Sequence, residues 1–226
     1  MRTRTRPAAK RSRRGKHRAT PVSAFPQEAA AQHLDTASPT SPSSFFVVGV
    51  GASAGGLAAV TELLKHVPSG AGLTIVIIQH LDPKHGSLTA GILSRVSSMP
   101  VDEVRDGMRI RPNHVYVIPP NRNMRLLNGV LKLSPRTETR GQHLPIDMFF
   151  RSLAEDRKEH GIGVVLSGIA SDGTLGVQAI KSEGGFTFAQ DPITAQYDGM
   201  PRSAILSGAV DIVETPEGIA REITKM

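Results

Sequence analysis

The chain has 226 residues, 39% of them hydrophobic and 21% charged, which is ordinary for a soluble globular protein with a sizeable core. Its lack of cysteine excludes disulfides, thiolate nucleophiles and thiolate metal sites, and fits a reducing, cytoplasmic compartment. The net charge of +7 arises at the N-terminus, because residues 1–20 hold nine Lys and Arg without an acid, while residues 45–226 carry 18 basic and 18 acidic side chains.

Residues 1–44 form a basic stretch followed by a segment rich in Ala, Pro and Ser. Too few large apolar side chains are present there to offset the entropy of ordering, so we predict a disordered tail and linker before one catalytic domain at 45–226. A solvated tail is the simplest interpretation; the alternatives are an arm that binds nucleic acid or another anionic surface, and an organellar transit peptide. No apolar run is long enough for a transmembrane helix or a secretory signal.

Short β-branched runs alternate with amphipathic stretches from Phe45 onward, which is typical of a parallel sheet covered by helices. Residues 45–50 and 73–79 are strongly apolar, as in strands that are buried on both faces. Between them, apolar residues recur at helical spacing from Leu57 to Val67. We therefore predict one βαβ unit over 45–79, with a right-handed crossover.

Further elements are expected along the rest of the chain. Asn128-Gly129 predicts a tight hairpin turn between two short strands, and Pro145 suits the first residue of a helix. The expected elements are a helix at 86–97, strands at 115–118 and 130–133, a helix beginning at Pro145, a strand at 162–166, a helix at 173–183 and a strand at 186–189. This order predicts an α/β fold with a doubly wound, mostly parallel sheet, helices on both faces and a small β-hairpin.

The stretch GVGASAGG, which follows the first expected strand, fits two motifs with different functions. Gly49, Gly51 and Ala54 match G-x-G-x-x-G/A, which places a dinucleotide pyrophosphate at a helix N-terminus. Gly51, Ser53 and Gly55 match G-x-S-x-G, a tight turn that raises a serine hydroxyl above the strand end. A purely structural glycine-rich turn is the third interpretation.

The tip of the second strand helps to separate these interpretations, because a dinucleotide site needs an acid there for the ribose hydroxyls. The tip reads Gln79-His80-Leu81-Asp82, in which His80 is placed to face Ser53 and to act as its base. Asp82 is the residue that still favours a nucleotide, and His85 is a minor rival for the base. His80 is therefore the candidate general base.

A serine nucleophile of this kind also needs a carboxylate that orients the histidine. Asp172 is the best candidate, since it lies in the small-residue loop after the strand at 162–166. The alternative role is that of a helix N-cap, which is an ordinary position for an aspartate before a helix. Because Ser53, His80 and Asp172 each follow the C-terminal end of an expected strand, they should meet in the crevice at that edge of the sheet.

Four sequence phrases occur in an order that marks a family resemblance: GASAGG (51–56), IIQHLDP (77–83), SGIASDGTLG (167–176) and DGMPRSAILSG (198–208). Over 45–215 the chain resembles the catalytic domain of CheB, the protein-glutamate methylesterase of bacterial chemotaxis. The resemblance implies a doubly wound α/β domain with a catalytic triad at Ser53, His80 and Asp172. It also implies that the substrate is a γ-glutamyl methyl ester on the cytoplasmic helices of a chemoreceptor, with glutamine deamidation as a second activity of some members.

The mechanism that the resemblance implies is acyl transfer. His80 takes the proton as Ser53 attacks the ester carbonyl, methanol leaves, and water hydrolyses the acyl-enzyme. The backbone N–H of Ile169 would stabilise the oxyanion, with the turn at Ala54 as a second donor, and no metal or cofactor is required. Relatives often have a hydroxyl residue in place of Ala54 and Met-Gly in place of Ile169-Ala170, and the added methyl group of Ala170 is the more consequential change for the loop.

Residues 198–202 are expected to form a loop near the same crevice. There Arg202 would bind an acidic receptor segment and Met200 would contact the substrate, with capping and packing as their respective alternative roles.

Regulation should differ from that of many relatives, which carry an N-terminal receiver domain where this chain has 44 residues. We expect constitutive activity or control in trans, by a response regulator or together with a methyltransferase. The runner-up function is a catalytically weak or inactive signalling module that binds methylated receptors, and a nucleotide-binding oxidoreductase is the third.

Overall fold

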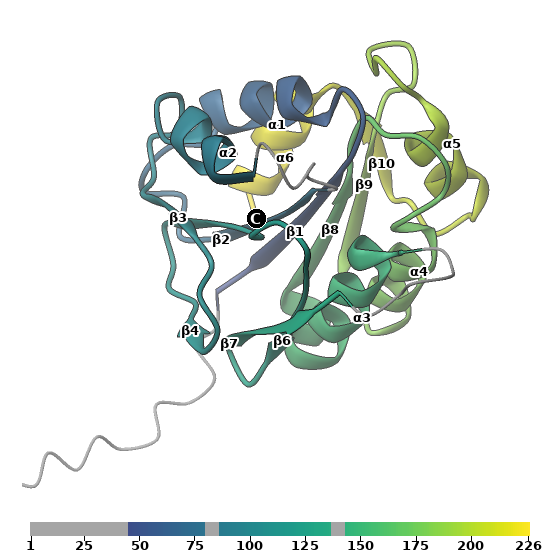
Figure 1. The fold of residues 1–226 in the computed structure, drawn as a ribbon. Helices are drawn as coiled ribbons and strands as arrows, with labels where there is room; N and C mark the ends of the chain where they lie inside the picture. The colour runs from purple at the N-terminus through teal and green to yellow at the C-terminus, as the bar shows by residue number, and fades with distance from the viewer. Residues whose placement is uncertain (1–44, 80–85, 137–142) are drawn as a thin grey trace, which may run out of the picture. The chain divides into compact units, whose positions relative to one another are not determined.

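The computed structural model describes residues 45–79, 86–136 and 143–226. Within these ranges a seven-stranded sheet has the order β10-β9-β8-β1-β2-β5-β3, and every neighbouring pair of its strands is parallel (Figure 1). The strand bounds are β1 Val47–Ala52, β2 Thr74–Gln79, β3 Val101–Glu103, β5 His114–Val117, β8 Gly161–Val165, β9 Phe186–Gln190 and β10 Ile212–Glu214.

The strand order reverses between β1 and β8 at the centre of the sheet. From β1 the chain builds outward through β2 to β5 and β3, and from β8 it builds in the other direction to β9 and β10. This doubly wound arrangement confirms the predicted fold class. The C-terminal ends of β1 and β8 flank the switch point, which is where open α/β sheets bind their ligands.

Helices cover both faces of the sheet, as Figure 1 shows. The first face carries α1, α2 and α6, and the second carries α3 and α4 together with α5. The helix bounds are α1 Gly56–Lys65, α2 Gly86–Leu93, α3 Pro145–Arg157, α4 Thr174–Ser182, α5 Gly199–Leu206 and α6 Pro216–Thr224, and a short 3-10 turn follows α3 at Lys158–His160. None of the helices in the described ranges is long and apolar enough to cross a bilayer.

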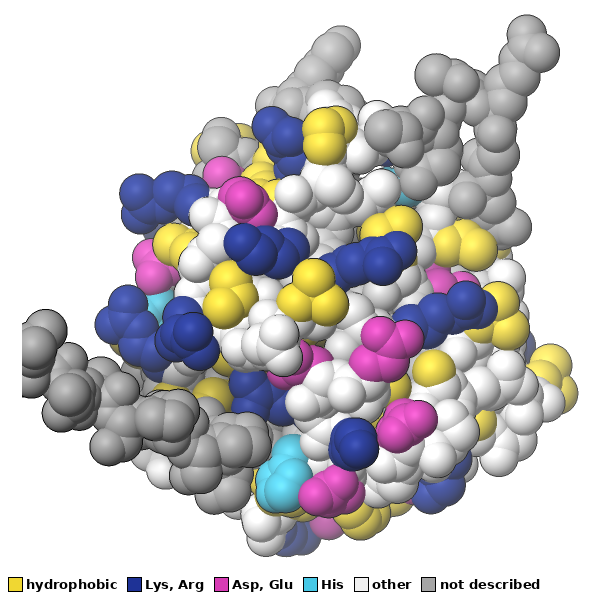
Figure 2. All heavy atoms as spheres, turned by 90° about the horizontal axis from the view of Figure 1, so that it is seen from below, with side chains coloured by type: hydrophobic (Ala, Val, Ile, Leu, Met, Phe, Trp, Pro, Cys, Tyr) yellow, Lys and Arg dark blue, Asp and Glu magenta, His cyan; other side chains and the backbone are white. Residues whose placement is uncertain are grey.

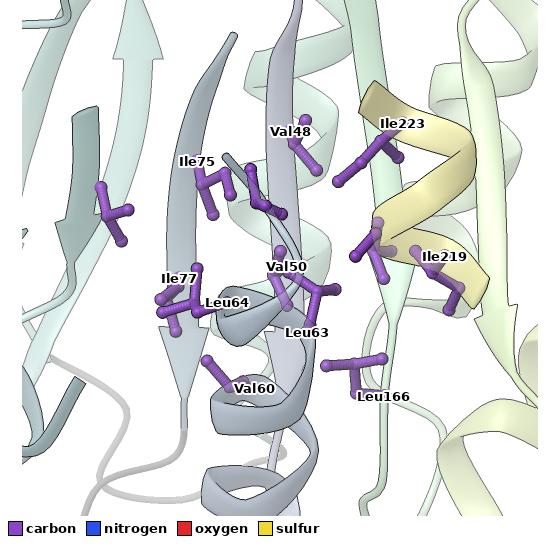
Figure 3. Close-up of a cluster of buried hydrophobic side chains, with 14 of the residues drawn as sticks. Val48, Val50, Val60, Leu63, Leu64, Ile75, Ile77, Leu166, Ile219 and Ile223 are labelled. Carbon is purple, nitrogen blue, oxygen red and sulfur yellow. The ribbon is translucent and has the colours of Figure 1, made fainter. Parts of the chain in front are cut away.

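Strand β1 shows how the sequence packs both faces at once. Val48 and Val50 are fully buried in the core shared with α1 and α6 (Figure 3). On the other face, a side chain at Gly51 would place its Cβ 2.4 Å from Cγ2 of Ile146 in α3. The alternation of β-branched residues with glycine therefore lets α3 approach the sheet closely, and it brings the first turn of α3 beneath the switch point.

A second sheet contains the hairpin and corrects one expectation from the sequence. Asn128 and Gly129 form the turn with φ values of 51° and 72°, as expected for Asn-Gly, but the strands they join are β6 Arg122–Leu127 and β7 Val130–Pro135. The predicted strand at 115–118 belongs instead to the parallel sheet, as β5. Strand β4, Met108–Arg109, completes the small antiparallel sheet beside β7.

Other elements also differ from the predictions. Helix α2 ends at Leu93, before the expected end at residue 97. Residues 199–202 begin helix α5, so most of the expected loop at 198–202 is helical. Strand β10 and helix α6 at the end of the chain had not been predicted.

The surface that faces the viewer in Figure 2 carries Lys, Arg, Asp and Glu side chains mixed over the same area, with hydrophobic side chains between them. This mixture agrees with the balanced charge of residues 45–226. No continuous area of one sign is seen among the described residues on that side.

Candidate active site

Ser53 is the first residue after β1, and its backbone is held on both sides. Its N–H donates a hydrogen bond to the carbonyl oxygen of Ser167 (3.0 Å), across the switch point in the loop after β8. Its own carbonyl oxygen accepts from the N–H of Gly56, the first residue of α1 (2.8 Å). The side chain is partly buried at this strand-to-helix turn. The backbone bonds fix the turn without using the hydroxyl group.

Ser167 joins the turn to a second loop and was not predicted as a site residue. Its hydroxyl donates to the carbonyl oxygen of Ala54 (2.9 Å) and accepts from the N–H of Tyr197 (3.0 Å). Its N–H donates to the side chain of Gln190 at the end of β9 (2.9 Å). Ser167 and Gln190 are both about 2% exposed or less, so the loops after β1, β8 and β9 share one buried network.

Gly168 lies against the Ser53 side chain and has no space for a Cβ. A methyl group there would lie 3.0 Å from Cβ of Ser53 and 2.1 Å from Sδ of Met200. Met200 is fully buried, and its N–H donates to the carbonyl oxygen of Gly168 (2.9 Å). The structure thus places Met200 beneath the loop, in the packing role, rather than on a surface that a protein substrate could reach.

Asp172 is 2% exposed in the loop between β8 and α4. Its carboxylate accepts hydrogen bonds from the N–H groups of Ile146 (Oδ2, 3.1 Å) and Asp147 (Oδ1, 2.9 Å) in the first turn of α3. The alternative role, as N-cap of the following helix, is not the one observed, because the N-cap of α4 is Gly173 and α4 has no side-chain cap hydrogen bond. Asp172 instead caps the neighbouring helix α3.

Ser53 and Asp172 therefore follow adjacent parallel strands at the same edge of the sheet. His80 lies outside the described residues, together with Asp82 and His85. Strand β2 ends at Gln79, which is in register with Ala52 at the end of β1.

The two backbone groups predicted to bind the oxyanion lie in these same loops. Within the described part of the chain, neither the N–H of Ile169 nor that of Ala54 donates a hydrogen bond to another group. The Ile169 side chain is 60% exposed. Both N–H groups therefore satisfy one requirement for an oxyanion donor, since no other acceptor occupies them.

The backbone of Ala170 adopts the left-handed conformation, with φ of 69°. This conformation costs an L-residue other than glycine about 1–2 kcal/mol. Ala170→Gly should therefore raise the free energy of unfolding by about 0.5–1 kcal/mol, after subtraction of the extra freedom that glycine gives the unfolded chain. Urea denaturation measures the change.

The control is Ala58→Gly, the same substitution at an exposed position inside α1. It should lower the free energy of unfolding by about 1 kcal/mol, because glycine is unfavourable in a helix. If both variants lose stability to the same extent, the loop at Ala170 is not strained.

A pocket of about 600 Å³ opens beside Ser53. Its walls are the turn after β1, the outer side of α1, and the side chains of Gln79, Ile92 and Gln196. The pocket is large enough for a single amino-acid side chain and part of its backbone. Ser53 forms part of the wall of this pocket.

Arg202 lies on α5 with a side chain that is 61% exposed, and it forms an ion pair with Asp198 one turn earlier (2.5 Å). The guanidinium group is therefore accessible from solvent and partly neutralised. Such an exposed pair contributes little to stability.

Asp147 is a further residue that the sequence reasoning missed. It is 5% exposed, lies next to the Asp172 carboxylate, and its own carboxylate accepts from the N–H of Gly176 in α4 (2.7 Å). Burial raises the pKa of Asp147, and the charge of Asp172 adds to this effect. The only sequence signal was an acid in the first turn of a helix, which is common in helices without any function.

Comparison with known proteins shows which family has this fold and these loops. The family model of the CheB methylesterases matches residues 48–223, a range that includes all but the first residue of β1, the loop of Asp172, and all but the last residue of α6. The chain belongs to the CheB methylesterase family. The expected resemblance is thereby confirmed for the catalytic domain.

Named relatives of the family agree with this assignment. The protein-glutamate methylesterase/protein-glutamine glutaminase 2 of Burkholderia pseudomallei is 35% identical over 181 residues, which are 80% of this chain and 53% of the relative. The protein-glutamate methylesterase/protein-glutamine glutaminase of Photorhabdus laumondii is 38% identical over 175 residues, 76% of this chain and 50% of the relative. The chain thus spans about half the length of these curated relatives.

A solved structure shares the fold. The CheB methylesterase catalytic domain of Thermotoga maritima superimposes with a TM-score of 0.74 at 28% identity, over 80% of this chain and 98% of that domain. The similarity therefore covers almost the entire catalytic domain of that CheB protein.

Proposed function

We propose that this chain is a serine esterase that hydrolyses γ-glutamyl methyl esters on chemoreceptors. The observation that carries the proposal is the placement of Ser53 and the buried Asp172 after adjacent strands at the switch point of a CheB-family sheet. The names of the relatives, protein-glutamate methylesterase/protein-glutamine glutaminase, supply the chemical class.

In the proposed reaction, Ser53 attacks the γ-carbonyl carbon while His80 accepts the hydroxyl proton. Asp172 stabilises the histidine cation, and the N–H groups of Ile169 and Ala54 stabilise the negative charge that develops on the carbonyl oxygen. The imidazolium protonates the departing methoxide, and methanol leaves. Water then attacks the acyl-enzyme with His80 again as base, and glutamate is released.

The environment of Asp172 suits this role. Two N–H groups at the start of α3 hold its carboxylate in one orientation. An ionised carboxylate is the form that stabilises a histidine cation.

Deamidation of glutamine follows from the same chemistry with a different leaving group. Attack of Ser53 on a γ-carboxamide gives the same acyl-enzyme and releases ammonia instead of methanol. An amide is the less reactive acyl donor, so we propose methyl-ester hydrolysis as the main activity and deamidation as a slower one.

The proposed substrate is the cytoplasmic helical region of a chemoreceptor, and the proposed place of action is therefore the cytoplasm. The exposed guanidinium group of Arg202 would pair with acidic residues of that region. Activity would be modulated by a response regulator or a methyltransferase acting in trans, and the basic N-terminal segment would contact anionic surfaces.

The test is the release of methanol and ammonia from two versions of one receptor cytoplasmic fragment, one methyl-esterified on glutamate and one carrying glutamine. The proposal predicts catalytic methanol release from the first version and slower ammonia release from the second. Binding of the methylated fragment without release of methanol would contradict the esterase proposal. It would instead support a signalling module that recognises methylated receptors.

A further inference from the structure

Two aspartates cap two neighbouring helices reciprocally. Asp172 caps the N-terminus of α3, the helix that contains Asp147, and Asp147 caps the N-terminus of α4, the helix that follows Asp172. Helix α3 begins without a side-chain cap at its N-cap residue, Leu144, and two N–H groups of its first turn donate to Asp172. Helix α4 begins without a side-chain cap at Gly173, and the N–H of Gly176 in its first turn donates to Asp147. The two helices lie side by side on one face of the sheet (Figure 1).

This reciprocal arrangement links the two carboxylates through the backbone. Asp147 uses its N–H to bind the Asp172 carboxylate and its own carboxylate to hold the start of α4. Asp172 lies two residues before α4, so a displacement of the α4 N-terminus would also move Asp172. The Asp147 side chain thus fixes the position of the loop that contains Asp172, the proposed carboxylate of the triad.

The surroundings of the Asp147 carboxylate show whether its negative charge or its hydrogen-bond acceptor stabilises the fold. Burial raises its pKa most, the N–H of Gly176 lowers it, and the charge of Asp172 raises it. Smaller lowering effects come from Arg151 and from the N–H of Gly173. Since the folded pKa lies above the unfolded value, the stability that protonated Asp147 provides is lost as the pH rises through the folded pKa. The negative charge is therefore a cost, and the hydrogen-bond acceptor is the useful group.

We propose that Asp147 is a positioning residue of the esterase, which holds Asp172 in the orientation that the triad requires by fixing the start of α4. This inference rests on the proposed function. It assigns no contact with substrate to Asp147. An acceptor at its Oδ1 position is necessary for full turnover, and a negative charge is not.

The test compares Asp147→Ala with Asp147→Asn in methanol release. Active sites are counted by titration with a phosphonate ester, so that kcat refers only to folded protein. Asp147→Ala should lower kcat about 10- to 100-fold at unchanged KM, because small misplacements of catalytic groups have effects of this size. Asp147→Asn keeps an acceptor for the Gly176 N–H and should remain within about threefold of the wild type.

The matched control is Thr215→Ala, which removes the N-cap of α6 on the opposite face of the sheet. The Thr215 hydroxyl accepts from the N–H of Gly218 (3.0 Å), so its loss should lower Tm without changing kcat. If Asp147→Ala likewise lowers Tm while kcat per active site stays within about threefold of the wild type, Asp147 is only a structural cap and the inference is wrong.

A second variant covers the case in which Asp147→Ala does not fold. The serine side chain of Asp147→Ser is too short to place an acceptor at the Oδ1 position that the Gly176 N–H uses, so kcat and KM of this variant should change as expected for Asp147→Ala. Wild-type protein that neither releases methanol nor reacts with the phosphonate would overturn the proposed function, and this inference with it. An active wild type with fully active Ala or Ser variants would overturn the inference alone.

Discussion

Ser53→Ala should reduce methanol release by about four to six orders of magnitude and leave the fold intact. The loss is expected because the acyl-enzyme cannot form without the hydroxyl group. The fold should persist because the turn is held by the backbone N–H and carbonyl of residue 53, which bond to Ser167 and Gly56 and do not depend on the side chain. Steady-state methanol release and circular dichroism measure the two effects.

The control for this prediction is Ser182→Ala, at an exposed serine at the C-terminal end of α4. Its turnover should equal that of the wild type. Retention of turnover within about tenfold by Ser53→Ala would show that another group, or a directly activated water, attacks the ester.

Asp172→Asn should lower kcat by about four orders of magnitude, the second-largest effect that we expect. The amide is isosteric, but it presents one N–H group to a position where the structure requires an acceptor. One of the N–H groups of Ile146 and Asp147 then loses its partner, and the neutral amide cannot stabilise a histidine cation. A buried N–H group without an acceptor should also lower the free energy of unfolding by about 1–3 kcal/mol.

Separate measurements of kcat and stability distinguish the two roles of Asp172. Urea denaturation gives the loss of stability, and kcat per titrated active site gives the catalytic loss. A variant that is destabilised but turns over at the wild-type rate would mean that Asp172 is a helix cap and no part of a triad.

Much of the fold could be predicted because its central strands are apolar throughout. β1 and β8 are buried along their length, and β2 is buried up to its last residue, Gln79, so hydrophobicity alone located these strands. Strand β6 escaped prediction because Arg122 and Arg125 are exposed on it and break the apolar pattern. The Asn128-Gly129 turn was predicted correctly, but the predicted first strand of the hairpin, 115–118, is β5, which is apolar because it lies inside the parallel sheet.

The candidate site was predictable where a residue's place follows from the strand before it. Ser53 comes directly after β1, and Asp172 lies in the loop that follows β8, so the edge of the sheet where they lie follows from the topology. Asp147 and Ser167 were missed because their partners are distant in the chain. The Asp147 carboxylate meets Gly176 only when α3 and α4 pack together, and the Ser167 hydroxyl meets Tyr197 only when the loops after β8 and β9 converge.

The most direct test of the account is the reaction of the protein with a phosphonate ester, followed by mass spectrometry and by methanol release in the same sample. We expect one adduct per chain, located on Ser53, with methanol release lost in proportion to the fraction modified. Ser53→Ala should acquire no adduct. Methanol release that persists in fully modified protein, or an adduct on a different residue that abolishes turnover, would contradict the assignment of Ser53 as the nucleophile.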